Sequence, residues 1–268
     1  NSEKKLTINV EDKTTDKIGD YLVGLYVSGD GAEANLKDSD ITVKANGKFS
    51  AALKIGKPEL PNTTKPADYK GAVVNSTGKM VLNTEDTKDS ATVRLFGTKS
   101  RLIADSDTSS GEIKSGNSAV VFDTQDYATK VRAFFINDNV SRNEPNKDQE
   151  VRLNNTKITT NSDNASLIVA QENLETAKDG DAKFLLKGKD SEAKAAKNGW
   201  LVEAKAGQLR TSNLSVAIDN QAKVIGLMHQ GSNANEHSKL DVKLDNQATW
   251  ELAQKEDEAE QRSTINAL

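Results

Sequence analysis

Apolar and polar residues alternate in short runs along this chain, and the clearest run lies near its end. In LDVKLDNQATWEL (240–252), apolar side chains occupy every second position on both sides of the polar pair Asp245-Asn246. A period of two is typical of strands that bury one face. We therefore predict two short strands here, joined by a polar turn.

Shorter versions of this pattern recur from end to end, separated by turns rich in Asn, Asp, Gly and Ser. Examples are KLTINV, DITVKA, ATVRLF, AVVFD, SLIVA and LSVAI. A stretch with apolar residues three to four positions apart, as in an amphipathic helix, is missing. The pattern predicts an all-β chain.

Three segments indicate that the strands repeat: LKDSDITV (36–43), LNNTKITT (153–160) and LRTSNLSV (209–216). Each is followed, after a polar turn, by another apolar pair. A degenerate repeat of about 20 to 25 residues, made of short strands and polar turns, is what a β-solenoid requires. With stacked strands about 4.8 Å apart, roughly eleven coils would form a rod about 50 Å long.

The composition agrees with such a rod. Apolar residues make up 35% of the chain and aromatic residues 4%, which is little for a compact globule. A core that is one side chain deep and repeats along an axis needs no more. We therefore expect one continuous body.

We expect the β-helix to occupy residues 1–239, and residues 240–268 to form the last coil and the start of a C-terminal cap. Loops are expected to leave the rod near residues 57–70, 138–150 and 187–199. The first two contain all four prolines, which cannot lie in a central ladder. The third contains GKDSEAKAAKNG, which could form one or two helical turns.

The chain offers little of the chemistry that enzymes and metal sites use. It has no cysteine, and its two histidines are His229 and His237, so we predict no disulfide, no metal site and no cofactor. The G-x-S-x-G elbow of esterases and the glycine-rich phosphate loops are missing. Since 40 residues are acidic, some carboxylates will face each other, and a carbohydrate-active β-helix enzyme is the least favoured alternative.

Neither a membrane span nor a leader is visible in the sequence. No apolar run approaches the roughly 20 residues of a transmembrane helix, and residues 1–10 lack the basic end and apolar middle of a signal peptide. The net charge of −4 is mild. We interpret the chain as a mature or excised piece whose targeting and anchoring segments lie outside it.

The last third resembles the C-terminal end of the passenger domain of bacterial autotransporters, which are exported by type V secretion. In that family a strand and a turn precede an A-x-W-x-L strand, and an S-x-[IV]-N-x-L segment follows. Upstream, Asn213-Leu214 and Gly226-Leu227 are similar to the coils of self-associating adhesin passengers. The residues that match the two C-terminal motifs are Ala248, Trp250, Leu252, Ser263, Ile265, Asn266 and Leu268.

The resemblance implies a right-handed parallel β-helix, preceded by a cleaved signal peptide and followed by an outer-membrane β-barrel. It also implies export through the periplasm and the outer membrane, with display at the bacterial cell surface or release from it. The strand with Trp250 would begin the cap over the last coil.

The main functional hypothesis is an adhesin that binds another copy of itself on a neighbouring cell, which would cause aggregation and biofilm formation. Rows of polar side chains along the rod would supply many weak contacts. The alternative is an adhesin for a host ligand: a glycosaminoglycan, a matrix protein such as fibronectin, or extracellular DNA. Acidic residues lie among its candidate lysines, so a solvated surface is the simpler explanation of that stretch. These ligand-binding candidates are Lys183, Lys187, Lys189, Lys194 and Lys197.

Overall fold

A computed structural model describes most of the protein, and β-strands are the only regular elements among the residues that it describes. The described residues are 5–12, 22–45, 50–56, 68–85, 87, 90–123, 148–171, 180–205, 212–232, 238–253, 263–265 and 268. They form 22 strands and no helix, and so contain no helix that is long and apolar enough to cross a membrane.

The strands form three parallel sheets, each listed here from the N-terminal to the C-terminal end of the rod. Sheet A contains β1 (Leu6–Glu11), β4 (Ser39–Lys44), β7 (Lys79–Thr84), β10 (Ser110–Ser115), β13 (Thr156–Thr160), β16 (Glu192–Lys194), β19 (Lys223–Ile225) and β22 (Thr249–Glu251). Sheet B contains β2 (Val23–Val27), β5 (Ala51–Ile55), β8 (Ala91–Phe96), β11 (Ser118–Asp123), β14 (Ile168–Gln171), β17 (Val202–Ala204) and β20 (Met228–Gln230). Sheet C contains β3 (Glu33–Leu36), β6 (Val73–Ser76), β9 (Arg101–Ala104), β12 (Gln149–Asn154), β15 (Gly180–Lys187), β18 (Ser212–Asp219) and β21 (Lys239–Leu244).

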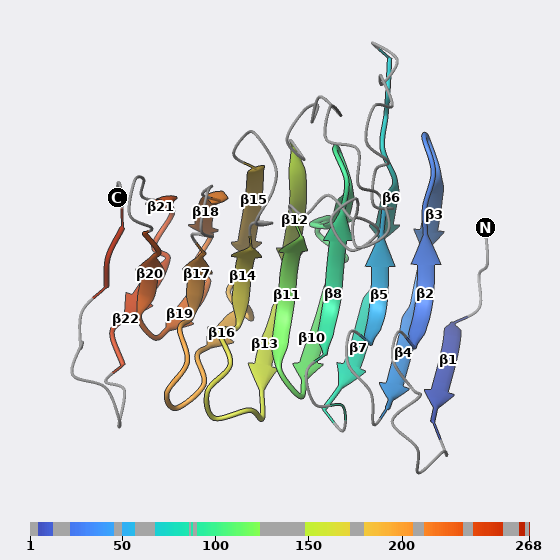
Figure 1. The fold of residues 1–268 in the computed structure, drawn as a ribbon, viewed down its shortest axis with the longest axis horizontal. Helices are drawn as coiled ribbons and strands as arrows, with labels where there is room; N and C mark the ends of the chain where they lie inside the picture. Colours follow the sequence, from blue (N-terminus) through green and yellow to red (C-terminus); the bar gives the residue numbers. More distant parts are fainter. Residues whose placement is uncertain are drawn as a thin grey trace, which may run out of the picture.

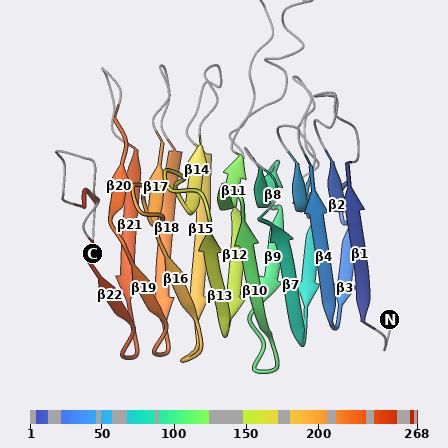
Figure 2. The same cartoon turned by 90° about the horizontal axis from the view of Figure 1, so that it is seen from below.

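Each turn of the chain adds one strand to each sheet, so the molecule is a parallel β-helix. Each strand pairs in parallel with the strand three places later in the chain. The described residues therefore form seven complete turns, and β22 begins an eighth. The two ends of the chain lie at opposite ends of the rod (Figure 1), and the strands of sheet A lie side by side along it (Figure 2). The predicted all-β solenoid is confirmed.

The expected coil length was wrong. Leu6 pairs with Ser39, 33 positions on, and Gly111 pairs with Thr156, 45 positions on. A turn is longer than about 25 residues because it holds three strands and three connections, so the described rod has seven full turns rather than eleven. Seven spacings of about 4.8 Å make sheet A about 34 Å across its strands.

The repeat segments explain this error. LKDSDITV and LNNTKITT are equivalent, because Ser39 and Thr156 occupy the same register position in sheet A, three strands apart. The third copy, LRTSNLSV, runs into β18 of sheet C instead. Its match to the other two therefore compared strands of different sheets.

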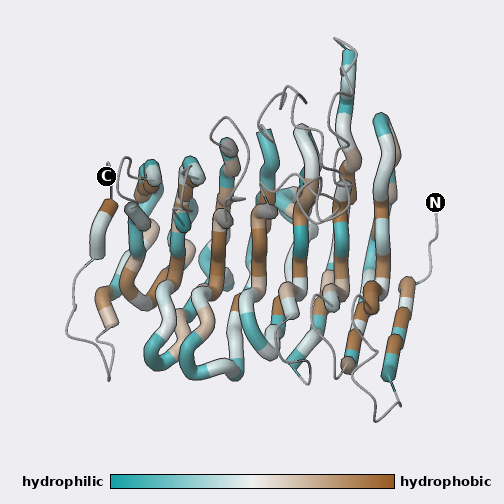
Figure 3. Tube along the Cα trace, in the orientation of Figure 1, coloured by the Kyte–Doolittle hydropathy of each residue, from teal (hydrophilic) through white to brown (hydrophobic). Residues whose placement is uncertain are grey.

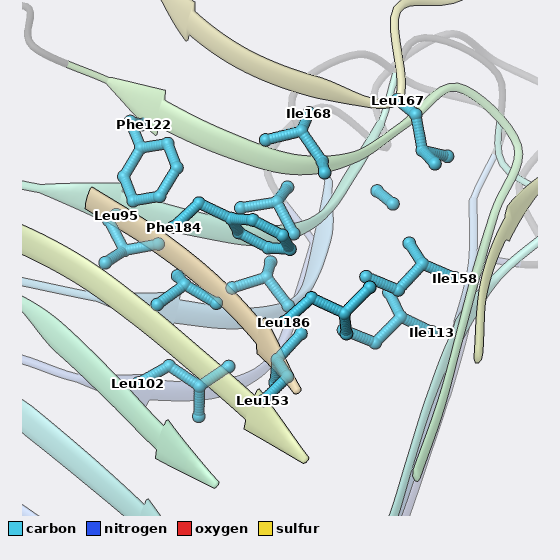
Figure 4. Packing of buried hydrophobic residues seen from close by; sticks show 14 of the residues in the cluster. Leu95, Leu102, Ile113, Phe122, Leu153, Ile158, Leu167, Ile168, Phe184 and Leu186 are labelled. Carbon is cyan, nitrogen blue, oxygen red and sulfur yellow. The ribbon is translucent and has the colours of Figure 1, made fainter. Parts of the chain in front are cut away.

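The core is one continuous column of apolar side chains enclosed by the three sheets. Side chains from all three sheets point into a common interior (Figure 4), and apolar segments recur at corresponding places in successive turns (Figure 3). Its members stack in register from strand to strand, which is why a modest apolar content suffices. The inward column of sheet A is Ile8, Ile41, Leu82, Ile113, Ile158, Ala193, Val224 and Trp250.

The third expected loop, 187–199, belongs to the rod. Residues 188–191 form a tight turn in which Ser191 N donates to Gly188 O (2.9 Å) and Gly188 has φ +95°. The chain then forms β16, whose Ala193 is buried between its exposed neighbours. One small apolar residue among charges was too weak a signal for a strand. The other two expected loops fall largely on residues 57–67 and 138–147, outside the described residues.

The C-terminal residues pair with the last strands of sheets A and B. β21 and β22 are the two predicted short strands joined by a polar turn. Trp250 packs against the core, and its indole Nε1 donates to Gly226 O at 2.8 Å. Residues 263–265 lie along the outer edge of β20: Thr264 N donates to Met228 O (3.0 Å), and Thr264 Oγ1 accepts from Gln230 N (3.0 Å).

Candidate binding surfaces

The five predicted lysines are not gathered into one site. Lys183 lies on the outer face of sheet C in β15, and Lys187 ends that strand. Lys189 lies in the following turn, Lys194 ends β16 in sheet A, and Lys197 lies in the connection to β17. Because neighbours in sequence follow the chain around the rod, these lysines are spread over two sheets and two connections.

Lys183 lies in a depression of about 530 Å³ beside sheet C. Basic residues from other turns reach the same place, and one of them, Lys99, donates through Nζ to Tyr69 O at 2.9 Å. Carboxylates are interspersed among these cations, so the depression lacks the single-sign field that attracts a polyanion. The charged residues that line it are Asp68, Lys70, Lys99, Arg101, Asp148, Glu150 and Lys183.

The outer face of sheet A carries a regular arrangement of charge. One side chain per strand projects outward in a column that follows the register of the sheet, with neighbours one strand spacing, about 4.8 Å, apart. The four central members alternate in sign. In order from β4 to β22, the column consists of Asp40, Val81, Glu112, Lys157, Glu192, Lys223 and Thr249.

Ion pairs within this face connect the alternating column to the next outward column. Lys223 Nζ lies 2.8 Å from Glu251 Oε1, and Lys114 Nζ lies 3.4 Å from Glu112 Oε2. The hydrogen bond to Glu251 raises the pKa of the Lys223 ammonium above its usual value. Its positive charge is therefore secure at physiological pH.

Sequence reasoning missed this column because its members are far apart along the chain. Glu112 and Lys157 are separated by 45 positions, and Lys157 and Glu192 by 35. The only available signal was the outward position within each strand, and it becomes useful only when the register of the turns is known.

The described residues give limited material for catalysis or metal binding. No group of three or more His, Asp or Glu side chains among them is arranged to hold a metal ion. His229 lies on β20 and stacks on Trp200, with ring centroids 4.6 Å apart and planes at 17°. His237 is outside the described residues.

Comparison with known proteins identifies no relative. No protein-family model matches the chain, and no curated protein or solved structure shows significant similarity to it.

Proposed function

We propose that this protein is an adhesin of the bacterial cell surface, which binds a second copy of itself through the outer face of sheet A. The observation that supports the proposal is the alternation of charge at Glu112, Lys157, Glu192 and Lys223. When a second copy of this column runs in the opposite direction, each of the four residues faces a residue of opposite charge.

The complementarity follows from symmetry. Let two copies face each other across sheet A, related by a two-fold axis that runs parallel to the strands between β13 and β16. The axis reverses the direction of the rod and keeps each column opposite itself. Glu112 then faces Lys223 of the second copy, and Lys157 faces Glu192 of the second copy, so all four positions form pairs of opposite charge.

The neighbouring outward column is compatible with this arrangement. Lys114 on β10 faces Ile225 on β19, and Thr159 on β13 faces Lys194 on β16. No two like charges meet in either column over these four strands. If the rods were instead parallel and related by an axis along their length, each residue would face itself and every charged position would repel.

The antiparallel arrangement is also the one that joins cells. Rods displayed on two opposing cells point towards each other, so their contact is antiparallel. An exposed ion pair contributes about 0.2 to 1 kcal/mol, so one pair of rods would bind weakly. Many rods between two surfaces multiply the effect, as aggregation and biofilm formation require. The resemblance to autotransporter passengers supplies the export route and the anchoring barrel of this proposal.

The test uses two variants, one that reverses both acidic residues of the column and one that reverses both lysines. In E112K/E192K the four positions become all positive, and in K157E/K223E they become all negative. Neither variant should self-associate, in sedimentation of the purified protein or in aggregation of cells that display it. An equimolar mixture of the two should associate, because opposite columns then face each other.

The matched control for the first variant is E33K/E150K, which makes the same two substitutions on the outer face of sheet C. This control should associate as the wild type does. Self-association of E112K/E192K at the wild-type level would refute the proposal, and so would a mixture that stays monomeric.

A further inference from the structure

A groove of about 440 Å³ crosses the outer face of sheet B, on a different side of the rod from the proposed adhesive face. Its residues come from four successive turns, those of β8, β11, β14 and β17. The buried side chains of Ala91, Val121 and Val169 lie beneath its floor, and they form a small cluster separate from the main core. An apolar strip of this kind on the outside of a sheet is not needed to close the β-helix.

The sides of the groove present polar groups that repeat with the turns. Asn117, Asn164 and Asn198 line it from three successive connections between sheets A and B. Asn198 Nδ2 donates to Asn164 Oδ1 at 3.2 Å. Ser118 and Ser166 repeat in the same way beside the floor. Amide and hydroxyl groups therefore recur at about one strand spacing, 4.8 Å.

One end of the groove holds an aromatic ring. Trp200 lines the groove and is supported on its other side by the stacked ring of His229. A rigid, half-buried ring beside polar groups is a typical anchor for an amphipathic ligand.

The charges of the groove are engaged by the protein itself. Glu203 accepts a hydrogen bond from Ser166 Oγ at 2.6 Å and lies 3.7 Å from Lys205 Nζ. The guanidinium of Arg94 lies over the ring of Phe96, 5.2 Å from its centre. The groove therefore favours an uncharged ligand, which recognises amide, hydroxyl and aromatic groups.

We infer that this groove binds a short segment of uncharged polysaccharide, extended along the axis of the rod. A sugar unit presents hydroxyl groups at its edges and C–H groups on its faces, which matches the polar sides of the groove and the ring of Trp200. The distance from β8 to β17 is three strand spacings, about 14 Å, which accommodates about three hexose units. Rows of amides and hydroxyls that repeat turn by turn suit a ligand that is itself a repeating chain.

The two tryptophans of the chain make the test direct. Trp250 lies in β22 at the end of sheet A, so W250F leaves Trp200 in the groove as the only tryptophan. This variant is titrated with cello-, chito- and manno-oligosaccharides of increasing length. At least one series should change the emission of Trp200 saturably, with an affinity that rises with length and levels off near three units. Absence of any change across the three series would overturn the inference.

Two groove variants in the W250F background establish where the sugar binds. S118Y fills the groove and should weaken binding about tenfold or more, whereas N164A removes one exposed amide and should weaken it several-fold. The control S215Y places the same bulk on the outer face of sheet C and should bind as W250F does. Equal affinity of S118Y, N164A and W250F would overturn the inference.

Two further measurements separate this inference from other outcomes. Heparin fragments serve as the charged probe. If they bind in the groove and the neutral sugars do not, the claim of an uncharged ligand fails. The column variants E112K/E192K and K157E/K223E should bind sugar normally. Failure of self-association and failure of sugar binding are therefore distinguishable.

Discussion

Lys157 and Glu192 stand side by side on the outer face of sheet A, in register on β13 and β16, although 35 positions separate them in sequence. They flank the position where a two-fold axis would make the alternating column complementary to itself. In the proposed contact each of them faces the other residue of the second copy. This pair is therefore the most informative place to alter the contact.

We expect Lys157→Glu alone to weaken self-association. The substitution replaces two attractive Lys157–Glu192 contacts by two contacts between carboxylates, which should lower the association constant on the order of tenfold, since each exposed pair contributes about 0.2 to 1 kcal/mol. Sedimentation equilibrium at low salt measures the change. The wild-type association should itself weaken as salt is added, because exposed charges are screened.

The double swap K157E/E192K should restore association. The column then reads minus, minus, plus, plus from β10 to β19, which still meets its opposite when reversed. The swap leaves the net charge unchanged, so its recovery cannot come from overall charge. A double swap that stays as weak as Lys157→Glu would contradict the antiparallel arrangement.

Removing a buried apolar side chain from the core should lower the stability of the protein. Ile113 is fully buried between Leu82 and Ile158 in the inward column of sheet A. Ile113→Ala should lower the free energy of unfolding by about 2 to 5 kcal/mol, because the stacked neighbours on both sides cannot close the cavity. Urea denaturation measures it. Lys114→Ala on the outer face is the control and should change stability by about 0.5 kcal/mol or less.

The alternation of apolar and polar residues predicted the strands well, because in a β-helix the inward face of each strand must be apolar. Ile41 and Val93 are inward positions of strands that the pattern identified, in DITVKA and ATVRLF. The length of a turn could not be predicted in the same way. Pairing offsets range from 26 positions at Lys223–Thr249 to 49 at Arg101–Glu150, so the connections vary in length and the sequence has no fixed period.

The two proposed binding surfaces could not be predicted from the sequence for the same reason. In a solenoid, residues close in sequence travel around the rod, while residues one turn apart become neighbours. The predicted lysines between Lys183 and Lys197 therefore lie on different sides of the rod, whereas Lys157 lies beside Glu192. Only the register of the turns brings the alternating charges and the groove residues together.

The C-terminal segment should protect the edge of sheet B. Thr264 Oγ1 accepts a hydrogen bond from Gln230 N at 3.0 Å, which satisfies an amide at the free edge of β20. Thr264→Val keeps the shape but removes the acceptor, at a cost of about 1 kcal/mol. Hydrogen exchange of the Gln230 amide should accelerate several-fold. Thr249→Val on exposed β22 is the control and should leave Gln230 unchanged; equal exchange in both variants would exclude this role.

Alkaline titration should find Lys223 charged beyond the range of an ordinary lysine. The hydrogen bond to the Glu251 carboxylate, 2.8 Å away, is the main cause of the raised pKa, and the charges of Glu251 and Glu192 add to it. The folded protein holds this proton more tightly than the unfolded chain does. The contribution of the pair to stability is therefore complete below pH 10.5 and is lost as the pH rises through the folded pKa.

NMR titration of the lysine Cε resonances tests this. Glu251→Gln should bring the pKa of Lys223 back towards 10.5. Asp245→Asn is the matched control: it should lower the pKa of Lys243, whose carboxylate partner is Asp245, and leave Lys223 unchanged. A wild-type Lys223 that loses its proton at or below pH 10.5 would show that the Lys223–Glu251 hydrogen bond does not persist in solution. The column would then carry a more mobile cation at β19, and the outermost pair of the proposed contact, Glu112 with Lys223 of the second copy, would contribute less than the central pair.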